Sequence, residues 1–180
     1  MKLVIASDIH GAADACARLM AAIREERPDR VVLLGDLLYH GPRNNLPADY
    51  EPKRVIEMLN SLAPQVIAVR GNCEAEVDQM VLGFPCMADH NVLFDEAAGV
   101  TLFLTHGHVY GPGYHNSVDR WPALPERSAF VYGHTHIKVN EASSSHPGAW
   151  VFNPGSVGIP KDGTASYGVY ENGRFAHRLL

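Results

Sequence analysis

The chain has 180 residues, 46% of them apolar, and a formal net charge of -5 at pH 7. This length and apolar content suit one globular domain with a sizeable core, and we expect a single domain over residues 1–180. The negative charge and the lack of basic clusters argue against a nucleic-acid-binding surface.

The first 70 residues alternate short apolar runs with helical patterns. Residues 2–7, 30–35 and 65–70 are apolar runs typical of strands that are buried on both faces. Residues 12–26 place apolar side chains at helical spacing, and Pro52 suits the first turn of a second helix that ends near residue 62. This order predicts parallel strands joined by right-handed crossovers.

The rest of the chain predicts mostly strands. Residues 110–127 are rich in Gly and Pro, which indicates a loop with a short helix. Asn172-Gly173 is a strong hairpin signal. We therefore expect an α/β fold in which a two-sheet β-sandwich is flanked by helices on its outer faces. The further strands are expected at residues 87–94, 100–105, 128–132, 137–141, 149–152 and 167–179.

Side chains able to bind metals follow five of the predicted strands. Ligands of α/β sheets bind beyond the carboxyl ends of the strands. His134 and His136 would face the same way in extended backbone. Each of these residues alone is common in turns and helix caps, but together they suit first-row metals such as Mn, Fe, Co, Ni or Zn. Two ions could share the set through one carboxylate. The seven residues are Asp8, His10, Asp36, Asn72, His106, His134 and His136.

Five motifs in this order resemble those of the calcineurin-like metallophosphoesterases. They are Asp8-Ile9-His10-Gly11, Gly35-Asp36, Gly71-Asn72, His106-Gly107-His108 and Gly133-His134-Thr135-His136. Three further segments are similar to bacterial YfcE-type phosphodiesterases. They are Gly41-Pro42-Arg43-Asn44, Gly71-Asn72-Cys73-Glu74 and Asn153-Pro154-Gly155-Ser156-Val157.

The resemblance implies a metal-dependent phosphodiesterase that acts on a small phosphodiester. It implies two divalent ions, most often Mn²⁺, with Asp36 bridging them and a metal-bridging hydroxide attacking phosphorus. The first ion would be held by Asp8, His10, Asp36 and His136, and the second by Asp36, Asn72, His106 and His134.

Cys73 departs from the pattern of many relatives, which have a His there that protonates the leaving group. A thiol with an unperturbed pKa of about 8.5 is a poor acid for this purpose, so we expect a preference for activated diesters. Arg43 either reaches the substrate phosphate or is a solvated loop residue. The predicted catalytic set is therefore Asp36, Asn72, Cys73 and Arg43. Asn44 is a further pocket candidate, and His108 is expected to support a neighbour or to line the pocket.

Other functions fit part of the pattern. A phosphomonoesterase or a nucleotide pyrophosphatase could use the same site. A nuclease should show a basic track or stacking aromatic residues. A metal-free interaction scaffold, as in the retromer subunit that shares this fold, should have apolar residues at ligand positions, and none is apolar here. A metal-storage or sensor protein should have a closed ligand shell.

The remaining expectations concern location and assembly. Cys16, Cys73 and Cys86 are odd in number and widely spaced, which suggests free thiols in the cytoplasm. No apolar run approaches the ~20 residues of a membrane helix, and the N-terminus lacks signal-peptide features. Homo-oligomers could form through exposed edges of the C-terminal strands.

Overall fold

The computed structural model describes residues 1–111 and 118–180. These residues form two five-stranded sheets, which confirms the predicted sandwich. The first sheet has the order β10-β9-β1-β2-β3, with β1, β2 and β3 parallel as predicted. Its strands are β1 (Lys2–Ala6), β2 (Arg30–Leu33), β3 (Val66–Ala68), β9 (Ser166–Glu171) and β10 (Arg174–Leu179).

The hairpin predicted at the C-terminus joins β9 and β10, which are antiparallel. Asn172 has φ 53° and Gly173 has φ 76°. Positive φ at both central residues is the geometry of the tight hairpin turn that an Asn-Gly pair favours.

The second sheet has the order β4-β5-β6-β8-β7, in which β5, β6 and β8 are parallel. Strand β4 begins at His90, later than the expected residue 87. The carbonyl of Ala88 instead accepts a hydrogen bond from the N–H of Arg70, so this segment continues along the end of β3. The strands are β4 (His90–Asp95), β5 (Val100–Thr105), β6 (Ser128–Val131), β7 (Lys138–Ala142) and β8 (Trp150–Pro154).

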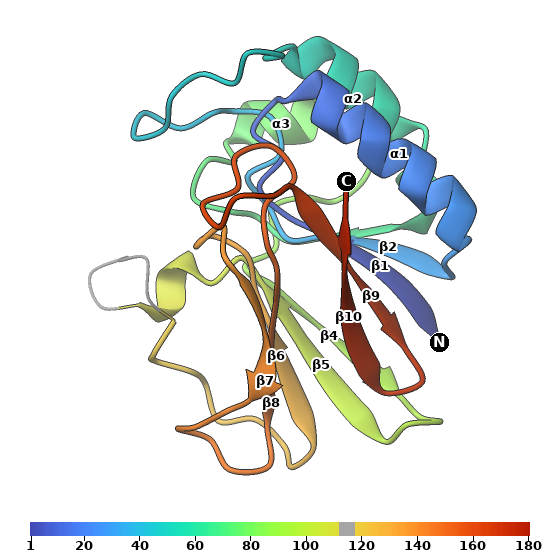
Figure 1. The fold of residues 1–180 in the computed structure, drawn as a ribbon, viewed down its shortest axis with the longest axis vertical. Coiled ribbons are helices and arrows are strands. Elements are labelled where there is room, and N and C mark those ends of the chain that lie inside the picture. Colours follow the sequence, from blue (N-terminus) through green and yellow to red (C-terminus); the bar gives the residue numbers. More distant parts are fainter. Residues whose placement is uncertain (112–117) are drawn as a thin grey trace.

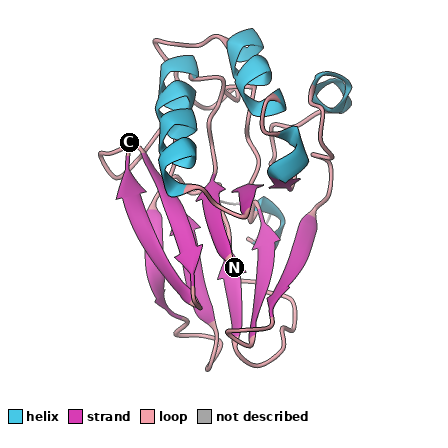
Figure 2. Cartoon of the chain, turned by 90° about the vertical axis from the view of Figure 1, so that its right-hand side faces the viewer, coloured by secondary structure: helices cyan, strands magenta, loops and turns pink. Residues whose placement is uncertain are grey.

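Alternating side chains of β1 divide the core into two layers. Val4 and Ala6 pack with apolar side chains of α1 (Ala13–Glu26) and α2 (Pro52–Asn60). Leu3 and Ile5 point the other way and pack with residues of the second sheet. Figure 1 shows α1 and α2 side by side against the first sheet, and Figure 2 shows the helices gathered at one side of the strands.

Aromatic residues cover the other face of the second sheet. Trp121 stacks on Phe130 of β6 with ring centroids 4.5 Å apart. The loop predicted over residues 110–127 lies partly in 112–117, outside the described residues, and its described part from 118 to 127 contains no helix. The 3₁₀ turn His108–Tyr110 ends at the first residue of this segment, and the short helix expected within it stays a prediction, because residues 112–117 lie outside the described residues.

One short helix was not predicted. Helix α3 (Glu76–Val81) has only six residues, too few to show helical periodicity in the sequence. The carboxylate of Asp78 accepts a hydrogen bond from the N–H of Ala75 at 2.7 Å and so caps the helix start. A second 3₁₀ turn, Ala63–Gln65, leads into β3. None of the helices described is long and apolar enough to cross a membrane.

Candidate metal centre

The seven predicted ligands meet at one edge of the sandwich. They lie just beyond the carboxyl ends of β1, β2, β3, β5 and β6. Six of them are buried, and the seventh, Asn72, is exposed on the wall of a pocket. The parallel strands therefore deliver these side chains to one place, as the sequence predicts.

The backbone at this edge is unusual. Asp8, His10, Asp36, His134 and His136 have φ of 56°, 51°, 53°, 64° and 60°. A left-handed conformation is uncommon for residues other than glycine and tends to occur at functional sites. The expectation that His134 and His136 face one site through extended backbone is therefore wrong. They reach it from a left-handed turn, because the chain bends sharply after β6.

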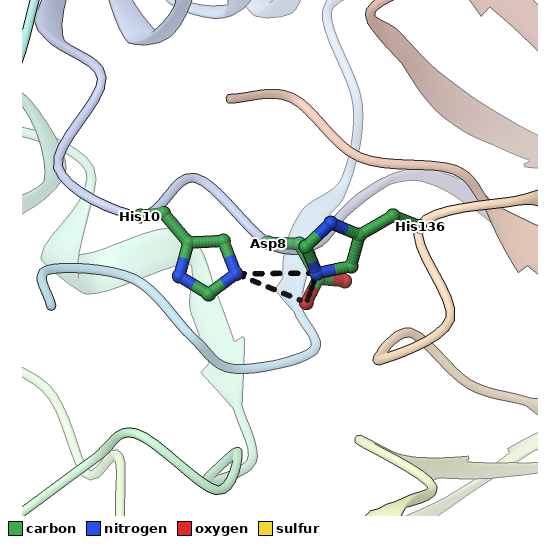
Figure 3. A group of neighbouring side chains, drawn as sticks. All are labelled: Asp8, His10 and His136. Atoms are coloured by element: carbon green, nitrogen blue, oxygen red, sulfur yellow. Dashed lines mark hydrogen bonds and ion pairs between the residues drawn. The ribbon is translucent and has the colours of Figure 1, made fainter. Parts of the chain in front are cut away.

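The first half of the centre consists of Asp8, His10 and His136 (Figure 3). The Nε2 of His136 lies 3.1 Å from Oδ1 of Asp8 and 3.2 Å from Nε2 of His10. The Nε2 of His10 lies 3.6 Å from the same Asp8 oxygen. Three potential ligand atoms thus face one small space.

The second half is built around Asp36 and His106. Oδ2 of Asp36 lies 3.4 Å from Nε2 of His106 and 3.6 Å from Nε2 of His10. Nε2 of His106 also lies 3.2 Å from Oδ1 of Asn72, and its ring centroid is 5.1 Å from that of His134. The Asp36 carboxylate therefore lies between the two halves, within 3.6 Å of a ring nitrogen in each.

Backbone carbonyls fix the orientation of three imidazoles. The Nδ1 atoms of His10, His106 and His136 donate to the carbonyls of Tyr39 (2.7 Å), Leu34 (2.7 Å) and Ile159 (2.6 Å), respectively. Because a carbonyl can only accept, Nδ1 carries the proton in each ring. The unprotonated Nε2 of a neutral ring then points into the centre, which is the usual arrangement of metal-binding histidines.

This arrangement fits divalent metal ions. The Nε2 atoms of His10 and His136 approach each other to 3.2 Å beside Oδ1 of Asp8. Among the described residues, the buried atoms Oδ1 of Asp8 and Nε2 of His134 have no hydrogen-bond partner. Oxygen and nitrogen atoms that converge on one small space, two of them without a hydrogen-bond partner, fit a cation, and the mixed O/N set suits first-row metals.

Charged side chains of the centre shift one another's pKa values. Burial disfavours the charged form of His106, but the carboxylates of Asp36 and Asp8 outweigh it and raise the pKa to about 10. Burial also acts against the Asp36 carboxylate, but His106 lowers the pKa of that group to about 2. Burial and the charge of His106 lower the pKa of His134 to about 4. A metal ion that binds here therefore has to displace a proton from His106.

Glu74 supports the centre and was not predicted to do so. Its carboxylate accepts hydrogen bonds from the backbone N–H groups of Asp36 (2.8 Å), Leu37 (2.7 Å) and Gly71. Burial and the nearby Asp36 charge raise the pKa of Glu74 to about 7. Its position two residues after Asn72 was the available signal, but the sequence does not show which N–H groups it contacts.

The turn after β8 supports the first motif. The hydroxyl of Ser156 donates to the carbonyl of Asp8 at 2.8 Å, and the N–H of Val157 donates to the carbonyl of Ser7 at 3.1 Å. This explains why a segment far along the chain accompanies the ligand motifs.

A pocket of about 230 Å³ opens onto the centre. Arg43, Asn44 and Cys73 line it, as does Lys161, which was not predicted. Burial and the charge of Asp36 raise the pKa of the Cys73 thiol well above its usual value. His108 is buried with its ring 5.4 Å from that of His106, and its supporting role stays a prediction.

The two-sheet fold, with its predicted metal ligands at one sheet edge, is that of a class of phosphoesterases. Residues 1–173 match the calcineurin-like phosphoesterase superfamily domain, and the chain belongs to this superfamily. The predicted family is thereby confirmed.

Particular relatives are close in sequence and fold. Phosphodiesterase YfcE of Escherichia coli K12 is 48% identical over 174 residues, which cover 96% of this chain and 88% of YfcE. The solved structure of YfcE, a phosphoesterase from E. coli, matches with a TM-score of 0.86 and covers 96% of this chain and 89% of that one. A novel archaeal phosphodiesterase, 20% identical with a TM-score of 0.66 and full coverage of both chains (100% each), shares the fold.

Proposed function

We propose that the protein is a metal-dependent phosphodiesterase that hydrolyses a small phosphodiester at a binuclear centre. The observation that carries this proposal is the position of the Asp36 carboxylate, 3.6 Å from Nε2 of His10 and 3.4 Å from Nε2 of His106. The identity with YfcE, which is named a phosphodiesterase, supports the same reaction class.

The roles of the side chains follow from their positions. Asp8, His10 and His136 would hold one divalent ion, and Asn72, His106 and His134 the other, with Asp36 shared. Such ions supply positive charge for the phosphoryl oxygens and lower the pKa of water. Mn²⁺ is the ion we propose, because the resemblance to the family implies it, although Fe, Co, Ni or Zn also accept this mixed set of oxygen and nitrogen ligands.

The chain's own residues orient the substrate and limit its leaving group. Arg43 lines the pocket, where its guanidinium group can donate two parallel hydrogen bonds to an anionic group of the substrate. The neutral thiol of Cys73 carries no charge and is a weak donor, so it contributes little to departure of an alkoxide. Diesters with good leaving groups should therefore react fastest.

The test is removal and return of metal. We expect a chelator to abolish hydrolysis of bis(p-nitrophenyl) phosphate and Mn²⁺ to restore it. Asp36→Asn should lower metal content and reduce kcat/KM by about 100-fold or more, since it removes the shared charge. Asp14→Asn changes an exposed carboxylate of α1 and is the matched control. Activity that survives complete metal removal would overturn the proposal. A panel of monoesters, diesters and nucleotide pyrophosphates would identify the preferred ester.

A further inference from the structure

Two cations line the pocket beside the metal centre. Arg43 belongs to the loop between β2 and α2, and Lys161 to the loop between β8 and β9. The N–H of Lys161 donates to the carbonyl of His136 at 3.1 Å, which fixes this residue next to a predicted ligand. The pocket is therefore positive on walls that come from two separate loops.

Neither cation is neutralised by a described residue of the protein. Within residues 1–111 and 118–180, neither the Arg43 nor the Lys161 side chain forms an ion pair. The carboxylate of Asp162, the next residue in the chain, interacts with another lysine. Oδ1 of Asp162 pairs with Nζ of Lys138 at 2.6 Å, and its Oδ2 accepts the N–H of Lys138 at 2.7 Å.

A simple diester does not need this extra charge. The carboxylates of Asp8 and Asp36 cancel half the charge of two divalent ions, and a singly charged diester with an attacking hydroxide cancels the rest. The two unpaired cations in the same pocket are therefore suited to bind a negative charge on a part of the substrate other than the reacting phosphoryl group.

The pocket walls also restrict the substrate's shape. Among the described residues that line the pocket, none is Phe, Tyr or Trp, and the two His rings there belong to predicted metal ligands, so little stacking surface is left for a base. Its volume of about 230 Å³ is small for a ligand site. A compact, polar substituent fits better than a nucleoside.

We infer that Arg43 and Lys161 form an anion subsite, and that the substrate is a compact phosphodiester whose second substituent carries a carboxylate or phosphate group. This inference rests on the proposed function and extends it to the substrate class. Lys161 would be a specificity-determining residue, because it binds the part of the substrate that does not react.

The kinetic test compares three p-nitrophenyl phosphodiesters whose second group is propyl, 2-carboxyethyl or 2-phosphonoethyl. The leaving group is the same, so only the added charge differs. We expect the wild-type protein to prefer a charged substrate by about fivefold to tenfold in kcat/KM, mainly through KM, since exposed charge pairs are screened. The preferred anion identifies the natural group. The Arg43→Gln/Lys161→Gln variant should lose the preference, whereas Lys53→Gln on α2 should keep it.

A binding measurement separates this inference from the proposed function. Calorimetry with metal-loaded protein would compare phosphonoacetate with ethylphosphonate, which are similar in size and differ by a carboxylate. We expect phosphonoacetate to bind about fivefold more tightly, and Lys161→Gln to remove the difference. Equal binding of the two ligands, or equal turnover of the charged and propyl diesters, overturns the subsite while leaving the phosphodiesterase proposal standing. Failure to hydrolyse any diester overturns the proposed function, and the calorimetric comparison still decides the subsite.

Discussion

The carboxylate of Glu74 accepts a hydrogen bond from the backbone N–H of Asp36 at 2.8 Å. It also accepts from the N–H of Gly71, on the loop that carries Asn72. One side chain thus holds together the loops after β2 and β3, each of which supplies a predicted ligand. The left-handed Asp36, with φ 53°, needs such support because its conformation is unfavourable in isolation.

Glu74→Gln should therefore weaken metal binding without changing any ligand. In Gln, one of the two carboxylate oxygens of Glu74 is replaced by an NH₂ group. This group cannot accept hydrogen bonds from the backbone N–H groups that Glu74 contacts. We expect metal affinity to fall by about 10-fold to 100-fold and stability by about 1–3 kcal/mol. Metal titration and urea unfolding would measure the two effects. Glu76→Gln, an exposed change at the start of α3, is the control. Unchanged metal affinity in Glu74→Gln would show that the two loops hold their positions without this carboxylate.

Much of this architecture could be predicted because it depends on local patterns. Apolar runs locate the strands, and the polar residue after each run lies at the sheet edge where parallel strands end. Asp8 and Asp36 were predicted in this way, and the structure brings them together. The predicted start of β4 was three residues too early, because contacts with the end of β3, and not strand propensity, decide where β4 begins.

The support around the site could not be predicted, because it depends on contacts between distant segments. Lys161 looks like an ordinary charged loop residue in the sequence, and the motif that contains Glu74 does not show what this carboxylate contacts. Their surroundings become clear only when the loops after β2, β3 and β8 are placed together. The left-handed turn at His134 and His136 is also hidden, since neither residue type demands positive φ.

Gly71 lies so close to Asp36 that no side chain fits. A Cβ on Gly71 would lie 2.1 Å from Oδ1 of Asp36 and 2.7 Å from its backbone N. We expect Gly71→Ala to displace the shared carboxylate, lower stability by about 1–3 kcal/mol and reduce bound metal. Thermal unfolding and metal analysis would measure both. Gly83→Ala, where the nearest atom would be 3.5 Å away, should change neither. Full metal content in Gly71→Ala would contradict the predicted role of this contact.

Cys73 should set the range of leaving groups. Burial and the Asp36 charge keep its thiol neutral, so the wild-type protein lacks a strong acid at this position. Cys73→His should raise kcat/KM for methyl or alkyl esters by about tenfold or more, with a smaller gain on p-nitrophenyl esters. Steady-state kinetics on a series of leaving groups would show a flatter dependence on leaving-group pKa. Cys73→Ser is the control, because it adds no acid. If the rate depended on leaving-group pKa equally in Cys73→His and in the wild-type protein, this role of residue 73 would be ruled out.

Tyr170 and Asp95 connect the two sheets through a buried hydrogen bond of 2.9 Å. Tyr170→Phe leaves this oxygen of the buried Asp95 carboxylate without its donor, and we expect a loss of about 1–3 kcal/mol of stability at pH 8. Burial, followed by the hydrogen bond to Asp95 and its charge, raises the pKa of Tyr170. A raised folded-state pKa favours the neutral phenol in the folded protein. Its contribution is therefore complete below the unfolded pKa of about 10 and is lost as the pH rises through the folded value.

The stability gap between wild type and Tyr170→Phe should accordingly be constant from pH 7 to pH 9 and narrow above about pH 10. Urea unfolding across this range would measure it. Tyr39→Phe alters an exposed ring and should show almost no gap at pH 8. Equal stability of wild type and Tyr170→Phe at pH 8 would mean that this hydrogen bond does not join the sheets as the structure indicates. A stability difference that widens as the pH increases would mean the same.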